Sequence, residues 1–286
     1  ELSAATIIYR KFKRLRMDLK VWSKNISHIK QLTLNCAKVI LHFDGLEEWR
    51  PLTTPEFNFR KIVKLHHENL LRIHYIYWKQ RCTIRYIKVG EENSKFFHAM
   101  ASERLRKNAI ASLRIDGNDP VSDHTQMAGI LWYSFKNRMG HAQCINMGFD
   151  LPQLIQPVEG LEVLSAPFSQ EEINKVLAEL PADRAPGPDG FNGMFIKKCW
   201  PIIEQDFLHL IQAFYDGQIS LENINGSLIT LIPKMISPQG PDDFRPISLT
   251  NTCLKFLTKL LANRLQKVIL QCIHKNQYGF LKSRSI

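Results

Sequence analysis

Two basic residues stand beside short strand-like stretches in the C-terminal half of the chain, and their types suit phosphate binding. Lys234 follows the apolar run 227–232, and Arg245 is the second residue of the run 244–249. A Lys ammonium is a flexible point charge, whereas an Arg guanidinium is a rigid fork that donates paired hydrogen bonds. Two such stretches joined by a loop form a hairpin, which we expect to present both cations to a triphosphate. The plain alternative is a surface Lys and an Arg paired with one of the two aspartates that precede it.

A second candidate is the loop 181–190, which is too rich in Pro and Gly for a helix or strand to cross. Gly187 and Gly190 flank Pro188 and Asp189, and a residue without Cβ permits close backbone approach and positive backbone angles. Such a loop could lie against a ligand. The alternative, that Pro and Gly only set the course of a turn, stays open.

The sequence lacks the patterns of a metal site. The six cysteines are too far apart for the short-spaced zinc pattern. His67-Glu68 is followed by Leu71 where a metalloprotease helix would carry its second His. We therefore expect no metal-binding residue in the chain.

Composition favours a packed protein with a basic N-terminal third. Hydrophobic residues make up 44% of the 286, and no apolar run reaches the length that spans a bilayer, so we expect no membrane association. Residues 1–110 hold 22 Lys and Arg against 10 Asp and Glu, a balance of +12, whereas residues 111–286 hold 16 against 17. A concentrated positive field attracts phosphate backbones. The alternative is a solvated helix surface. Scattered cysteines without a signal peptide indicate reduced thiols in an intracellular protein.

The N-terminal part is predicted to be helical. Ile8, Phe12, Leu15, Leu19, Trp22, Ile26 and Ile29 alternate four and three apart, the spacing of a helix that packs on a partner helix. Asp44-Gly45 is expected to end this stripe, and a second striped helix follows Pro55. A short connection between the two favours an antiparallel hairpin.

The rest of the chain is predicted to alternate helices with short strands. In order, we expect a helix over 93–107, a strand over 109–115, a helix over 122–139 capped by Gly140, a linker over 141–166, a helix opened by the Ser169/Glu172 capping box, a helix to about residue 216 broken near Pro201, the two strands above, and a helix over 254–272.

Four stretches together resemble the reverse transcriptases of non-LTR (LINE-type) retrotransposons, most closely those of plants. They are Trp78-Lys-Gln-Arg81 with Gly90-Glu-Glu-Asn-Ser-Lys-Phe-Phe-His98; Ala185-Pro-Gly-Pro-Asp-Gly-Phe191; Leu231-Ile-Pro-Lys234 with Phe244-Arg-Pro-Ile-Ser-Leu249; and Asn276-Gln-Tyr-Gly-Phe280 with Arg284-Ser-Ile286. Their order and spacing also fit, and the resemblance spans roughly residues 75–286.

The resemblance implies an α+β architecture in three parts. Residues 1–108 would form a basic, mainly helical linker region with a long antiparallel hairpin, and residues 109–166 a strand-turn-helix connector with a loop. Residues 167–286 would be an incomplete fingers subdomain with a small antiparallel sheet, truncated before the palm. The apolar faces of the last helix, including Leu257, Leu260 and Leu261, would then be exposed, because the palm subdomain on which they pack is missing.

The same resemblance implies roles for particular residues. Lys234 and Arg245 would reach the triphosphate of the incoming nucleotide or the template backbone. Template or nucleic-acid binding is implied for Arg184, Gly187, Asp189, Gly190, Gln277, Gly279, Phe280 and Arg284. For the residues after position 276, a helix-to-strand turn is the alternative.

In the family the metal-binding aspartates come from later motifs. The pair Asp242-Asp243 stands in the first fingers motif immediately before Arg245, so it does not match them. The resemblance thus implies a fragment of an RNA-directed DNA polymerase whose partners are RNA template and DNA primer, with dNTP in the intact enzyme, and which has no catalytic residue and is inactive alone. The resemblance also implies that the intact family enzyme uses Mg²⁺ and that the protein is found inside the cell, in a nuclear or cytoplasmic ribonucleoprotein. Alternatives are a non-enzymatic nucleic-acid-binding helical module or a decayed transposon remnant.

Overall fold

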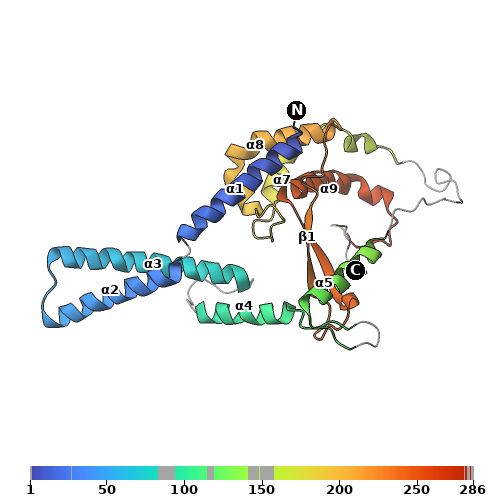
Figure 1. The fold of residues 1–286 in the computed structure, drawn as a ribbon. Helices are drawn as coiled ribbons and strands as arrows, with labels where there is room; N and C mark the ends of the chain where they lie inside the picture. The colour runs from blue at the N-terminus through green and yellow to red at the C-terminus, as the bar shows by residue number, and fades with distance from the viewer. Residues whose placement is uncertain are drawn as a thin grey trace. The chain divides into compact units, whose positions relative to one another are not determined.

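The computed structural model describes residues 2–26, 28–82, 94–114, 119–140, 148, 158–279, 281 and 284. Helices predominate, and one small antiparallel sheet joins β1 (Ser227–Pro233) to β2 (Phe244–Thr250) (Figure 1). The predicted α+β class is therefore confirmed. The described helices are α1 (Ala4–Ile26), α2 (Ile29–Trp49), α3 (Thr54–Cys82), α4 (Ser94–Asn108), α5 (His124–Met139), η1 (Leu161–Leu164), α7 (Gln170–Glu179), α8 (Gly193–Tyr215), η2 (Pro241–Asp243) and α9 (Thr252–Cys272).

The chain forms two compact units. The first contains Glu1–Met17, Leu131–Ile232 and Arg245–Ile286, and the second contains Asp18–Ile130 and Pro233–Phe244. No described helix is long and apolar enough to cross a membrane.

The core of the first unit is built on α8, against which α7, α9 and the start of α1 pack. Phe207 of α8 is fully buried and contacts Phe256 of α9 with a ring-centroid distance of 5.2 Å. Phe12 of α1 meets Phe191 edge-on at 5.1 Å, and Ile8 is fully buried beside them. Aromatic pairs of this kind add stability beyond their buried area.

This packing corrects the predicted partner of the first helical stripe. Ile8 and Phe12 pack into the core of the first unit rather than on the next helix, and the stripe is divided between α1 and α2. Helical spacing shows that one face is apolar but not what covers it. Trp22, farther along the same stripe, is 61% exposed.

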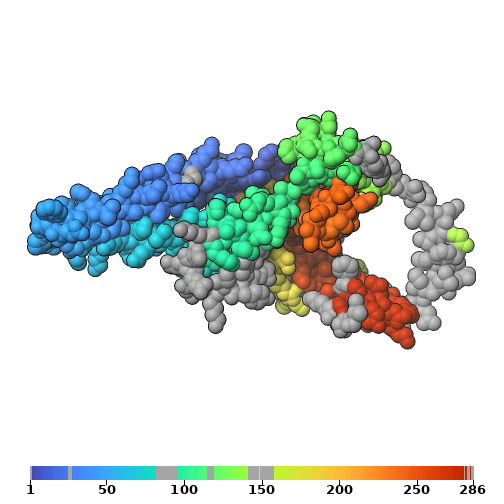
Figure 2. Space-filling view, turned by 90° about the horizontal axis from the view of Figure 1, so that it is seen from below, coloured from blue at the N-terminus to red at the C-terminus, as the bar shows by residue number. Residues whose placement is uncertain are grey.

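The second unit contains the antiparallel hairpin, which is formed by α2 and α3. Figures 1 and 2 show the two helices side by side, in agreement with their contacts. The prediction that Asp44-Gly45 ends the first of them is wrong, because α2 continues to Trp49. Buried Arg60 of α3 donates hydrogen bonds to Asp44 at 3.0 Å and to Glu47 at 3.1 Å. These bonds hold the last turns of α2 in place although a helical Gly costs about 1 kcal/mol.

The predicted break near Pro201 is also wrong, since α8 runs through it without interruption. Pro in a helix interior costs about 3 kcal/mol. Ile196 and Trp200 before it and Ile203 and Phe207 after it are all buried in one core. Burial of four large side chains on one face can offset that cost, at about 1.5–3 kcal/mol each.

Local signals at element ends were more reliable. Gly140 has φ 68° and caps α5 as predicted, and Ser169 with Glu172 forms both hydrogen bonds of the capping box. The predicted strand over 109–115 is reduced to an isolated antiparallel bridge between Leu113 and Val121, and residues 115–118 lie outside the described part. Of the predicted linker over 141–166, the described part is residue 148 and residues 158–166, which include η1.

The expectation for the last helix needs a correction too. Leu257 and Leu260 of α9 are 2% and 1% exposed and belong to the core of the first unit, so they need no further domain to cover them. Leu261, one residue on, is 40% exposed.

Candidate nucleic-acid interface

Lys234 lies in the loop that joins the two strands. Its backbone N–H donates to the Asp243 carbonyl and its Nζ to the Asp242 carbonyl, both at 2.7 Å. The Asp243 carboxylate accepts from the backbone N–H groups of Gln239 at 2.8 Å and Gly240 at 3.0 Å, which lowers its pKa. Asp243 therefore closes the loop, and the exposed ammonium of Lys234 keeps donor capacity beyond its single carbonyl contact.

Arg245 is the second residue of β2, and its side chain is exposed. It follows the fully buried Phe244, which anchors the start of the strand. Successive strand residues point to opposite faces, so burial of Phe244 directs Arg245 to the solvent side. The Arg245 guanidinium is thus exposed on a strand whose start is fixed by buried Phe244, and a fixed, exposed guanidinium is what phosphate recognition requires.

The Pro- and Gly-rich loop 181–190 packs against the junction between β2 and α9. A Cβ on Gly187 would lie 2.2 Å from the Thr250 carbonyl oxygen, so only Gly fits there. Gly190 has φ 82°, in the left-handed region that favours Gly.

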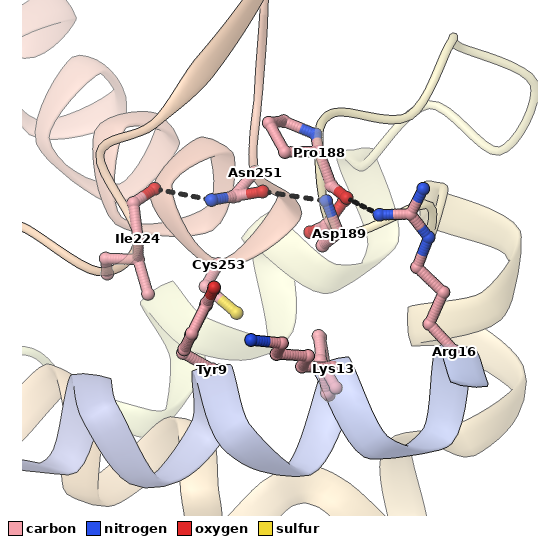
Figure 3. Close-up of a pocket in the computed structure, with 9 residues that line it drawn as sticks. Tyr9, Lys13, Arg16, Pro188, Asp189, Ile224, Asn251 and Cys253 are labelled. Atoms are coloured by element: carbon pink, nitrogen blue, oxygen red, sulfur yellow. Dashed lines mark hydrogen bonds between the residues drawn. The ribbon is translucent and has the colours of Figure 1, made fainter. Parts of the chain in front are cut away.

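Asp189 fastens this loop to the start of α9. Its carboxylate accepts from the Thr252 N–H at 2.6 Å and from the Phe191 N–H at 3.3 Å. Its own N–H donates to the Asn251 side-chain oxygen at 2.9 Å, while the Asn251 amide donates to the Ile224 carbonyl at 2.9 Å (Figure 3). A carboxylate at a helix N-terminus is favoured by the helix dipole. Gly187, Asp189 and Gly190 thus have a packing role that accounts for their types, as the turn alternative expects.

These contacts bring the loop beside α1, which the sequence did not associate with it. Arg16 donates a hydrogen bond from one guanidinium nitrogen to the Pro188 carbonyl. A pocket of about 210 Å³ opens here, lined by Tyr9, Phe12, Lys13, Arg16, Pro188, Asp189, Ile224, Asn251 and Cys253 (Figure 3). The five cations in residues 10–16 were a visible signal, but nothing in the sequence indicated which loop they face.

The one thiol of the pocket is not suited to covalent chemistry. Cys253 is 2% exposed, and burial raises the pKa of its thiol far above the usual value. The thiolate is the nucleophilic form, so Cys253 stays a protonated wall residue. Among the residues that the structure describes, no group of three His, Cys, Asp or Glu is placed to hold a metal ion.

The remaining candidate residues lie in separate segments and do not form one site. Arg184 is exposed on the loop, and Gln277 and Gly279 are exposed after α9. Arg284 donates to the carbonyls of His274 at 2.7 Å and Gln277 at 3.0 Å, so its guanidinium partly serves to close the turn. Phe280 lies outside the described residues.

The second unit has its own pairing of an aromatic ring with a cation. The Arg81 guanidinium lies 3.4 Å from the Tyr77 ring centroid, and Tyr77 is 42% exposed. Tyr75 packs on Phe97 at 5.4 Å, and Trp78 donates to a nearby His, so these two rings serve packing. Tyr77 also meets Trp78 edge-on at 5.2 Å, and it is the most exposed of the three rings.

Comparison with known proteins points to transposon-encoded proteins, although no family model matches the chain. The uncharacterized 149 kDa protein of transposon TX1 of Xenopus laevis is 24% identical over 202 residues, which are 68% of this chain and 15% of that protein. A probable RNA-directed DNA polymerase from transposon BS of Drosophila melanogaster is 29% identical over 123 residues, 42% of this chain and 14% of the relative. The RNA-directed DNA polymerase from mobile element jockey of Drosophila funebris is 27% identical over 120 residues, 40% and 13% respectively.

These similarities confirm the resemblance to LINE-type, non-LTR retrotransposon reverse transcriptases. The chain spans about one seventh of the length of each relative. A plant origin stays a prediction, since all three relatives come from animals.

Proposed function

We propose that the chain contributes template and nucleotide binding to the RNA-directed DNA polymerase of a LINE-type retrotransposon. The observation that carries the proposal is the similarity to two RNA-directed DNA polymerases of transposons, each over about 120 residues of the chain. The cationic side chains support it. Lys234, in the loop after β1, and Arg245, in β2, are both exposed, and phosphate recognition needs accessible donors of this type.

In this proposal Lys234 and Arg245 contact the phosphates of an incoming nucleotide or of the template, and Arg184 adds a contact to the template backbone. Gly187, Asp189 and Gly190 shape the loop that carries Arg184, and Gln277, Gly279, Phe280 and Arg284 lie along the template. Mg²⁺ is implied for the intact family enzyme. The described residues offer no acidic cluster that fits it, and the proposal assigns them no metal chemistry.

Binding of a fluorescein-labelled single-stranded RNA by the 286-residue chain tests the proposal. Fluorescence anisotropy would give the dissociation constant between 50 and 300 mM KCl for the wild type, for Lys234→Ala with Arg245→Ala, and for Lys198→Ala. Each lost phosphate contact should reduce the slope of log K against log salt by about 0.7 for a single strand. Lys198 is exposed on α8, so Lys198→Ala controls for the loss of one surface charge, against two in the double variant. Equal slopes for the double variant and the control would refute the role of the hairpin cations.

A second candidate function is a nucleic-acid-binding helical module that acts without polymerase chemistry. The exposed Tyr77 ring with Arg81 above it favours this candidate, because an aromatic beside a cation is a stacking platform for unpaired bases. Tyr77→Leu would then weaken RNA binding more than the hairpin double variant does. The opposite order would favour the polymerase proposal, as would nucleotide incorporation on a primed RNA template by a longer chain.

A further inference from the structure

The first part of α1 is a strongly basic helix held in a fixed orientation. Residues 4–17 contain five Lys and Arg and no Asp or Glu. Ala5, Ile8 and Phe12 are buried in the core of the first unit, and they fix which way the remaining side chains point. Lys11 forms an ion pair with Asp206 at 2.7 Å. The helix therefore presents its other cations on a rigid support.

Two of those cations border the pocket beside the loop 181–190. Figure 3 shows the Lys13 ammonium extending into the pocket, and the Arg16 guanidinium standing at its edge next to Pro188. Arg16 uses one nitrogen for the Pro188 carbonyl, and a guanidinium has five N–H donors. Lys13 and Arg16 are three positions apart and so lie on adjacent turns of one helix face.

The walls of the pocket suit a flat, weakly polar group. Tyr9, 36% exposed, and Ile224 form apolar sides. Asp189 is the acidic residue of the lining, and its carboxylate is already satisfied by the Thr252 and Phe191 N–H groups. Asn251 has both its side-chain oxygen and its amide engaged in hydrogen bonds. Lys13 and Arg16 therefore supply the cationic donors of the pocket, and the Tyr9 hydroxyl adds a neutral one.

We infer that this pocket binds one nucleotide unit of a single-stranded nucleic acid. The phosphate lies between Lys13 and Arg16, and the base lies against the Tyr9 ring. Positive charge along a backbone combined with an aromatic platform is the usual physics of single-strand binding. The inference rests on the proposed function and adds α1, which the sequence motifs do not include, to the surface that holds the strand.

The experiment compares variants of one helix in the full chain. Lys13→Gln and Tyr9→Leu alter the pocket, and Arg14→Gln removes the same charge from an exposed residue outside its lining. Anisotropy with an RNA and a DNA single strand of equal sequence is measured over the same salt series. Lys13→Gln should lower the salt slope by about 0.7 for the strand that the pocket holds, and Arg14→Gln should leave it unchanged. Tyr9→Leu should weaken binding by about 5- to 100-fold with little change in slope, because it removes the ring on which the base stacks.

A second measurement needs no variant. Acylation of the wild-type chain with an amine-reactive acetyl ester, read by peptide mass spectrometry, should show Lys13 protected by the bound strand and Lys61 of α3 unprotected. Equal protection of both, or equal slopes for Lys13→Gln and Arg14→Gln, would overturn the inference. Neither readout involves Lys234 or Arg245. The pocket inference can therefore be refuted while the hairpin variants still weaken RNA binding, and the hairpin role can be refuted while Lys13 is still protected.

Discussion

Arg264→Ala should destabilise the first unit by about 3 kcal/mol, because Arg264 is a buried cation that ties α9 to α7. It is 3% exposed and donates to both carboxylate oxygens of Glu172, at 2.9 and 2.7 Å. It also donates to the carbonyls of Ala166 and Pro167, and its guanidinium lies 4.0 Å from the Phe168 ring centroid. Removing one member of a buried pair costs about 3–5 kcal/mol. The lower end applies because the Glu172 side chain is 22% exposed and can regain water.

Urea unfolding followed by tryptophan emission measures this loss in the relevant unit. Of the five tryptophans, Trp200 is the buried one, at 8% exposed, and it stacks on Phe256 at 5.4 Å. The shift of tryptophan emission to longer wavelength on unfolding therefore reports mainly on the core next to α9. With a slope of about 2 kcal/mol per molar urea, a loss of about 3 kcal/mol lowers the midpoint by about 1.5 M.

The matched control is Lys259→Ala on the same helix. Lys259 pairs with Glu179 at 3.1 Å, but its side chain is 31% exposed, and pairs near the surface contribute about 0–1 kcal/mol. Its midpoint should therefore move by less than half as much. If Arg264→Ala shifts the midpoint no more than Lys259→Ala does, the buried bidentate pair does not stabilise the unit as argued.

The remaining predictions test three contacts of the first unit, with Gly129 of the second unit as a control. The Arg264 guanidinium lowers the folded-state pKa of Glu172. The pair therefore stabilises the fold fully above the unfolded pKa of about 4.3, and this stabilisation is lost as pH falls through the folded pKa. The urea midpoint of the wild type should fall with pH over that range, and the midpoint of Glu172→Gln should not. Gly187→Ala should lower the free energy of unfolding by at least about 1–3 kcal/mol, because its Cβ would meet the Thr250 carbonyl. Gly129→Ala in α5, where the space is open, should be neutral or stabilising by up to about 1 kcal/mol. A melting temperature of Gly187→Ala equal to or above that of Gly129→Ala would contradict this contact. Asp189→Asn should cost about 0.5–2 kcal/mol by weakening the N-terminal contact of α9, and an unchanged melting temperature would argue against that contact.

The elements of the fold were largely accessible from the sequence because their signals are local. The capping box at Ser169 and the left-handed Gly140 involve atoms within a few residues, and both formed as predicted. The two wrong helix ends share a cause. Gly45 and Pro201 each weaken a helix locally. The ion pairs of buried Arg60 with the half-exposed carboxylates of Asp44 and Glu47 outweigh that cost in one case, and a buried apolar face outweighs it in the other.

The candidate site was accessible only in part. Lys234 and Arg245 were proposed because one follows and the other opens a predicted strand. The structure leaves both exposed, and their role in binding stays a prediction. Lys13 and Arg16 were missed because 172 residues separate Arg16 from its partner Pro188. A sequence motif consists of residues that are close together in the chain. This pocket is lined by residues from a helix, a loop and a strand-to-helix junction that lie far apart in the chain.

Periodicity, charge and motif spacing are properties of the unfolded chain as well. They therefore indicate the kinds of element, the basic N-terminal third and the four motifs that resemble non-LTR reverse transcriptases before any contact is known. The packing of α1 into the core beside the Pro- and Gly-rich loop, and the capping of α9 by Asp189, become visible in the folded chain. Those contacts depend on which buried faces fit together, and burial of apolar surface is set by shape in three dimensions rather than by order along the chain.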